Sequence, residues 1–174
     1  MLELISITKS FNVTRALDNV SLAVSAGEIV SLLGRNGVGR STTIKSIMGQ
    51  VSSTGSVRFK GEEINGLKAY MVARKGLGYV PENREIFPTL TVRQNLMLGM
   101  KNASRSETEQ VVQLIRQVTA GKTLLMVEHD MSVVFNLADR ISVLVYGEVI
   151  ASGTPQEIRG NKAVQEAYLG TEQH

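Results

Sequence analysis

Hydrophobic and polar positions along the 174-residue chain predict strands and helices in alternation. Residues 2–7 and 20–24 alternate between apolar and polar side chains, which is typical of strands with one exposed face. Residues 28–33 are almost continuously apolar, as in a strand that is buried on both faces of a parallel sheet. Residues 41–48 follow with a helical period. The first unit is therefore a strand, a glycine-rich turn and a helix.

The same alternation continues toward the C-terminus. Further strands are predicted over residues 55–59, 76–80, 123–127, 141–146 and 148–151. Further helices are predicted over residues 67–74, 109–118 and 131–138, with two short helices between residues 155 and 169. Strands that alternate with helices indicate an α/β fold with right-handed crossovers.

Composition narrows the class of protein. Apolar residues make up 43% and charged residues 20% of the chain, which fits one globular domain over residues 1–174. The absence of cysteine excludes disulfides and thiolate metal sites and fits a reducing cytosol. A net charge of +3 is too small to indicate a nucleic-acid surface. No apolar run is long enough to span a bilayer, and no signal peptide is expected, so work at a membrane requires docking to another subunit.

The turn after the buried strand has the glycine spacing of a phosphate-binding loop, G-x-x-x-x-G-K-[ST], except that Arg40 replaces the lysine. Such glycines let backbone N–H groups approach phosphate oxygens, and the N-terminus of the next helix adds partial positive charge. The alternative is a glycine-rich turn without a ligand, but the flanking strand and helix favour a phosphate site. The candidate cofactor-binding residues here are Gly34, Arg35, Asn36, Gly37, Val38, Gly39, Arg40, Ser41 and Thr42.

Several further short stretches along the chain can be compared with known families. They are Lys9-Ser10-Phe11, Ala16 to Leu22, Gly78 to Pro88, Leu90-Thr91-Val92, Leu124 to Met131 and Ala167 to Gly170. Together with the loop, they cover nearly the whole chain. The sequence resembles the ATP-binding subunits of ABC transporters, and within them the branched-chain amino-acid uptake group.

This resemblance implies a fold and a set of site residues. The fold would be P-loop NTPase-like, with a mainly parallel sheet flanked by helices and an antiparallel N-terminal β subdomain. Phe11 would stack on adenine, Ser41 and Glu82 would contact Mg²⁺, and His129 would lie near the γ-phosphate of ATP. Glu82 and His129 are therefore the candidate catalytic residues. The alternatives are a core phenylalanine, a solvated turn glutamate and a structural histidine.

The first departure from the family is Arg40, because a planar guanidinium does not replace a compact ammonium conservatively. We expect weakened nucleotide binding and strongly reduced hydrolysis. Replacement of Arg40 by Lys should then raise the ATPase rate.

The second departure is an apparent internal deletion near residues 100–110. The family has there its helical subdomain, its Leu-Ser-Gly-Gly-Gln signature and its Walker B strand with the catalytic glutamate. Loss of a Walker B strand beside the phosphate-loop strand should leave a hole in the sheet, at a cost far above the roughly 5–15 kcal/mol that stabilises a domain. Either the fold repacks or the natural polypeptide is longer than this sequence, and the unaltered flanks favour the second.

The leading hypothesis is an ATP-binding subunit that couples ATP binding and hydrolysis to transport, with ATP and Mg²⁺ as cofactors. Its partners would be transmembrane subunits and a second ATP-binding subunit, and it would lie on the cytoplasmic face of the cell membrane. The rival is a degenerate nucleotide-binding partner without hydrolytic activity. A P-loop kinase or GTPase is a weaker third reading, because no guanine-specific Asn-Lys-x-Asp occurs.

Overall fold

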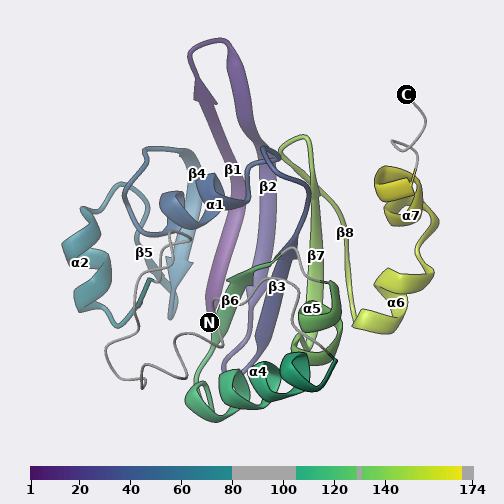
Figure 1. Cartoon of the computed structure of the whole chain (residues 1–174). Coiled ribbons are helices and arrows are strands. Elements are labelled where there is room, and N and C mark those ends of the chain that lie inside the picture. The colour runs from purple at the N-terminus through teal and green to yellow at the C-terminus, as the bar shows by residue number, and fades with distance from the viewer. Residues whose placement is uncertain (80–104, 129–130, 170–174) are drawn as a thin grey trace.

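The computed structural model describes residues 1–79, 105–128 and 131–169, which form two four-stranded sheets and the helices around them (Figure 1). The first sheet has the strand order β2-β1-β4-β5, and all its pairings are antiparallel. Its strands are β1 (Leu2–Phe11), β2 (Thr14–Val24), β4 (Thr54–Phe59) and β5 (Glu62–Glu63). The predicted antiparallel N-terminal β subdomain is therefore confirmed.

The alternation predicted for the first strand holds only up to a register shift. Leu2 and Leu4 are buried, but the next buried side chain is Ile7 rather than residue 6. Ser6 has a φ of 54°, and the pairing with β2 shifts between Leu4 and Ile7. An inserted residue of this kind turns the following side chains to the other face, so Ile7 reaches the core.

The second sheet has the strand order β6-β3-β7-β8, in which β6, β3 and β7 are parallel and β8 is antiparallel to β7. Its strands are β3 (Ile29–Leu33), β6 (Leu124–Val127), β7 (Arg140–Val145) and β8 (Glu148–Gly153). Four of the five residues of β3 are buried, as its continuous apolar sequence predicts. The predicted mainly parallel α/β architecture is confirmed.

The helices predicted over residues 41–48, 67–74, 109–118, 131–138 and 155–169 all form. The helices are α1 (Arg40–Ile47), α2 (Ala69–Arg74), α4 (Arg105–Val118), α5 (Met131–Leu137), α6 (Pro155–Gly160) and α7 (Lys162–Leu169). The start of α6 has a capping box, in which Glu157 N donates to Thr154 Oγ1 and Thr154 N donates to the Glu157 carboxylate. Helices α4 and α5 lie together near one end of the second sheet (Figure 1).

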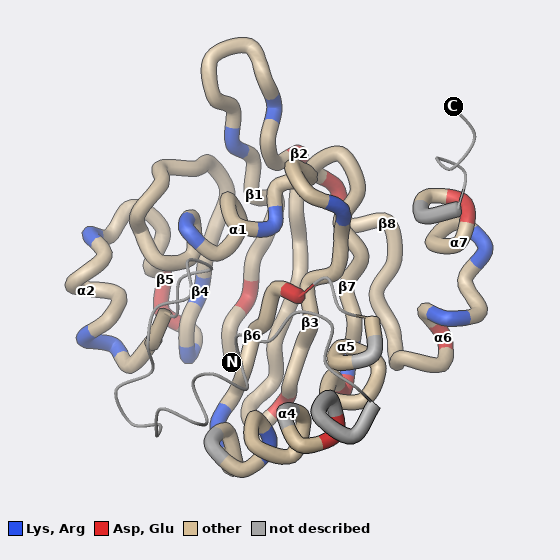
Figure 2. Tube along the Cα trace, viewed as in Figure 1, with Lys and Arg blue, Asp and Glu red and all other residues tan. Residues whose placement is uncertain are grey.

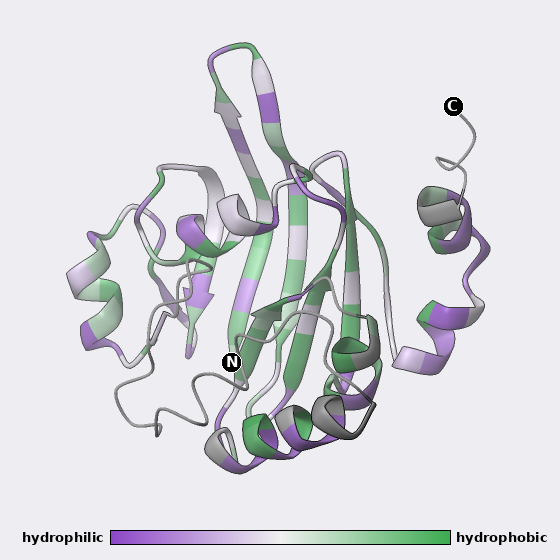
Figure 3. Ribbon diagram, in the orientation of Figure 1, coloured by the Kyte–Doolittle hydropathy of each residue, from purple (hydrophilic) through white to green (hydrophobic). Residues whose placement is uncertain are grey.

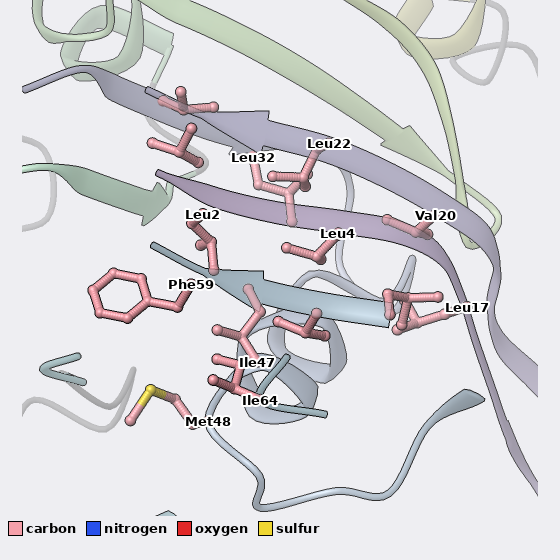
Figure 4. Close-up of a cluster of buried hydrophobic side chains, with 14 of the residues drawn as sticks. Leu2, Leu4, Leu17, Val20, Leu22, Leu32, Ile47, Met48, Phe59 and Ile64 are labelled. Atoms are coloured by element: carbon pink, nitrogen blue, oxygen red, sulfur yellow. The ribbon is translucent and has the colours of Figure 1, made fainter. Parts of the chain in front are cut away.

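The core joins the two sheets. Figure 3 shows apolar residues concentrated on the strands of both sheets. Figure 4 shows side chains from β1, β2, β3, β4 and α1 meeting in one cluster, with Leu4, Leu32 and Ile47 among them. The phosphate-loop strand and the helix after it are therefore fixed from both sheets. A second cluster packs α5, α6 and α7 near β7, and includes Val134, Ile141 and Ile158.

Two expectations from the sequence are wrong. Residues 76–79, predicted as part of a strand, form no strand, because no neighbouring strand in the described residues supplies backbone hydrogen bonds to them. No hole lies beside β3 either, because β6 and β7 pair with its two edges. Within the described residues, the sheet ends at β6 instead.

Candidate functional site

The turn between β3 and α1 adopts a conformation that depends on glycine. Gly37 has a φ of 83°, and Gly39, the residue that precedes α1, has a φ of 106°. Residues other than glycine rarely adopt such φ values. Gly39 offers no side chain to cap the helix, and the first turn of α1 contains no acidic residue. The N-terminus of α1 therefore keeps its partial positive charge uncompensated by its own sequence.

Close packing explains two of the three glycines. A Cβ on Gly34 would lie 2.6 Å from the carbonyl oxygen of Leu144, and a Cβ on Gly39 would lie 2.3 Å from that of Ala16. A Cβ on Gly37 would meet nothing within 4 Å. Gly34 and Gly39 thus let the loop pack against β7 and β2, whereas Gly37 faces open space in which a ligand can approach the backbone.

Backbone hydrogen bonds hold the loop to the β7–β8 turn. Gly147 N donates to Val38 O at 3.1 Å, and Asp18 N donates to Gly147 O at 2.8 Å. Thr43 donates from both its backbone N and its hydroxyl to Gly39 O, at 2.9 and 3.0 Å. The loop is therefore anchored to the β7–β8 turn, which is itself bonded to β2, and to its own helix.

The residues predicted for the phosphate site lie together in this loop. Gly34, Gly39 and Arg40 are buried, whereas Arg35, Asn36, Gly37, Val38, Ser41 and Thr42 are exposed or half-buried. Figure 2 shows basic positions around the start of α1 and on the neighbouring β1–β2 hairpin. The basic positions suit an anionic ligand, but Arg15 of the hairpin is already paired with Asp18 at 2.7 Å.

Arg40 is buried, with only 9% of its surface exposed. Its Nη1 donates to the main-chain oxygen of Glu128 at 3.1 Å, and its Nη2 donates to Oδ1 of Asn36 at 3.0 Å. No acidic side chain among the described residues forms an ion pair with it. The guanidinium therefore brings a buried positive charge to the loop.

Phe11 lies at the end of β1 in the β1–β2 hairpin, and it is 47% exposed. The alternative of a core phenylalanine is therefore wrong. Lys9 Nζ lies 4.9 Å from the centre of its ring, within the range of a cation–π contact. Phe11 pairs with Thr14 in the hairpin, and Thr14 is two residues from Ala16, whose carbonyl touches the loop at Gly39. Thr14 and Ala16 are therefore about 7 Å apart along the strand.

The two predicted catalytic residues, Glu82 and His129, lie outside the described residues. His129 follows Glu128 in the sequence, and the carbonyl of Glu128 accepts from Arg40. Sequence analysis missed three contributors to the site: this carbonyl, that of Ala16 and the turn residue Gly147. Carbonyls carry no side-chain signal, whereas the Tyr-Gly pair after an apolar strand does indicate the turn.

The fold is shared with solved ATP-binding cassettes. A nucleotide-free ATP-binding cassette from an ABC transporter superposes with a TM-score of 0.78 at 19% identity, over 97% of this chain and 98% of that one. A dimeric post-hydrolysis cassette bound to ADP and Pi superposes with a TM-score of 0.71 at 20% identity, over 89% and 99%. The fold is therefore that of the ATP-binding cassettes.

Family profiles match most of the chain. The ABC transporter profile matches residues 17–134, and that of the branched-chain amino acid ATP-binding cassette transporter matches residues 148–174. The chain belongs to the ABC transporter family.

Curated relatives point the same way. The chain is 28% identical to the high-affinity branched-chain amino acid transport ATP-binding protein BraG of Pseudomonas aeruginosa, over 98% of this chain and 100% of BraG. It is 26% identical to BraF of the same organism, over 98% of each chain. The alignment with BraG runs over 232 residues, although this chain has only 174. BraG therefore contains residues without a counterpart in this sequence.

None of the helices in the described part of the chain is long and apolar enough to cross a membrane.

Proposed function

We propose that this chain is the ATP-binding subunit of an ABC transporter that takes up branched-chain amino acids. The observation that carries the proposal is the loop between β3 and α1, whose glycine backbone and uncapped helix N-terminus suit the phosphates of ATP. The family membership and the likeness to BraG and BraF support the choice of nucleotide and of solute.

In this proposal the phosphates lie along residues 34–42. Mg²⁺ fits the donor set, because Ser41, half-buried on the first turn of α1, supplies the hydroxyl oxygen that this ion accepts beside phosphate oxygens. Glu82 is the second proposed protein ligand. The bound ion would neutralise charge on the terminal phosphates. His129 would donate a hydrogen bond to the γ-phosphate, and Phe11 would offer a ring face to adenine.

The proposed partners are transmembrane subunits and a second ATP-binding subunit, whether a copy of this chain or a homologue. The dimeric cassettes among the structural matches support a paired arrangement. The chain would act at the cytoplasmic face of the cell membrane, bound to the transmembrane subunits.

The test compares two glycines with the same backbone strain. Gly37 and Gly61 both have a φ of 83°, and a Cβ on either would meet nothing within 4 Å. Gly37→Ala should weaken Mg-ATP binding about tenfold or more, measured by calorimetric titration, because it places a methyl group where phosphate approaches. Gly61→Ala, in the β4–β5 turn, is the matched control and should bind as the parent chain does. Equal affinities in all three proteins, or no saturable binding in any, would count against the proposal.

A second candidate function is a nucleotide-binding partner that does not hydrolyse ATP. Two observations favour it. Arg40 stands where the family has lysine, and the residues of BraG without a counterpart here would include the family's catalytic glutamate. Residues 1–174 would then form one nucleotide-binding domain with an internal deletion near residues 100–110. The intact mass of the protein purified from its source decides between the two candidates. A mass equal to 174 residues, with Mg-ATP binding but no phosphate release, supports the second candidate, and a heavier active chain rejects it.

A further inference from the structure

Arg40 donates two hydrogen bonds within the chain itself. Its two hydrogen bonds reach acceptors on different segments: Asn36 within the loop, and the carbonyl of Glu128 directly after β6. The two segments are 92 residues apart in the chain, from position 36 to position 128. One guanidinium thus connects the loop to the end of β6.

The chemistry of arginine suits this connection better than that of lysine. A guanidinium presents its N–H groups in a rigid planar fork, so two acceptors on opposite sides can be held at fixed positions. An ammonium carries three donors on one nitrogen and cannot reproduce that span. Burial adds a requirement, because a positive charge that is 91% shielded from water needs acceptors around it.

We infer that Arg40 is a positioning residue that braces the phosphate loop against the end of β6, and that nucleotide phosphates compete with this brace for the guanidinium. Both acceptors in the brace are neutral oxygens, whereas phosphate oxygens are charged and form stronger hydrogen bonds with arginine. The competition with phosphate rests on the proposed function, whereas the brace does not. The loop is thereby preformed without nucleotide, and part of the phosphate-binding energy is spent on releasing the brace.

The first measurement is a double-mutant cycle on thermal unfolding of the full chain without nucleotide. Arg40→Met and Asn36→Ala should each lower the melting temperature by roughly 2–4 °C. The double variant should melt no lower than Arg40→Met alone, because Arg40→Met already removes the hydrogen bond between Arg40 and Asn36. Lys45→Met is the matched control, since Lys45 is an exposed basic residue on the same helix. Strictly additive losses, or a loss from Lys45→Met as large as that from Arg40→Met, would overturn the brace.

The second measurement is the affinity for Mg-ADP of the parent chain, of the variants above and of Arg40→Lys. Arg40→Lys should melt lower than the parent chain without nucleotide, yet bind Mg-ADP roughly tenfold more tightly, because lysine keeps the charge for phosphate and loses the brace. Arg40→Met should lose affinity. A lysine variant that melts lower and binds no more tightly would overturn the competition. If no variant binds nucleotide, the proposed function and the competition fail together, while a non-additive melting cycle still supports the brace.

Discussion

The two strands that flank β3 differ in how completely they are covered. On one side, β7 has four buried residues between half-buried ends, and it continues through a tight turn into β8. On the other side, all four residues of β6 are half-buried, and no strand in the described residues pairs with its outer edge. The phosphate loop is anchored on the β7 side, through Gly147 and the carbonyl of Leu144. The more fully covered flank of β3 is therefore the one that holds the phosphate loop through backbone contacts, whereas the β6 flank reaches it through the Arg40 side chain.

The largest expected difference between the two flanks is in the free energy of unfolding. Ile141 on β7 is fully buried, and Leu125 on β6 is half-buried; both lie on strands parallel to β3. Ile141→Ala should cost about 3–4 kcal/mol, because it leaves a cavity in a closed core. Leu125→Ala should cost about 1 kcal/mol, because less apolar surface leaves water there on folding. Equilibrium urea unfolding measures both losses, and equal losses would show that β6 is covered as fully as β7.

The ion pair between Glu28, the residue before β3, and Arg140 at the start of β7 should give the next largest effect. Arg140 Nε donates to Glu28 Oε1 at 2.7 Å and Arg140 Nη2 to Glu28 Oε2 at 3.1 Å, with both side chains mostly buried. The hydrogen bonds from Arg140 lower the pKa of Glu28 from 4.5 to about 2, against the opposing effect of burial. A lowered carboxyl pKa stabilises the folded chain above pH 4.5, and this contribution disappears as the pH falls toward 2.

Glu28→Gln should therefore lower the free energy of unfolding by about 2–3 kcal/mol at pH 7. The same variant should also flatten the fall in stability between pH 4.5 and pH 2. Urea unfolding across that pH range is the measurement. Glu3→Gln, at an exposed position on β1, is the control and should change stability by less than about 0.5 kcal/mol. A stability curve of Glu28→Gln that runs parallel to that of the parent chain would contradict the role of this ion pair.

The smallest expected effect concerns ATP binding at Phe11 in the β1–β2 hairpin. Phe11→Ala should weaken ATP binding by about 1 kcal/mol, roughly fivefold, through lost stacking on adenine. The affinity for tripolyphosphate should not change, because that ligand has no base. Val13→Ala, a fully exposed position in the same hairpin, should leave both affinities unchanged. Equal weakening for both ligands would show that Phe11 shapes the hairpin rather than contacting the base.

Local patterns in the sequence predicted the elements that depend on near neighbours. The strand–loop–helix unit at β3 and α1 follows from an apolar run, glycine spacing and a helical period within 20 residues. The strand predicted over residues 76–80 failed in residues 76–79, because a strand exists only where another strand pairs with it. The brace from Arg40 to Glu128 could not be predicted, because any residue has a backbone carbonyl. Glu82 and His129, placed by resemblance alone, stay predictions.

The three loop glycines would respond differently if this protein stopped binding nucleotide over evolutionary time. Gly34 and Gly39 are required by contacts of 2.6 and 2.3 Å with neighbouring backbone, so selection for folding alone would retain them. Gly37 has no such neighbour, and asparagine also tolerates its left-handed backbone. Genetic drift would therefore first alter position 37, and an intact glycine there records selection for a ligand more directly than the rest of the motif.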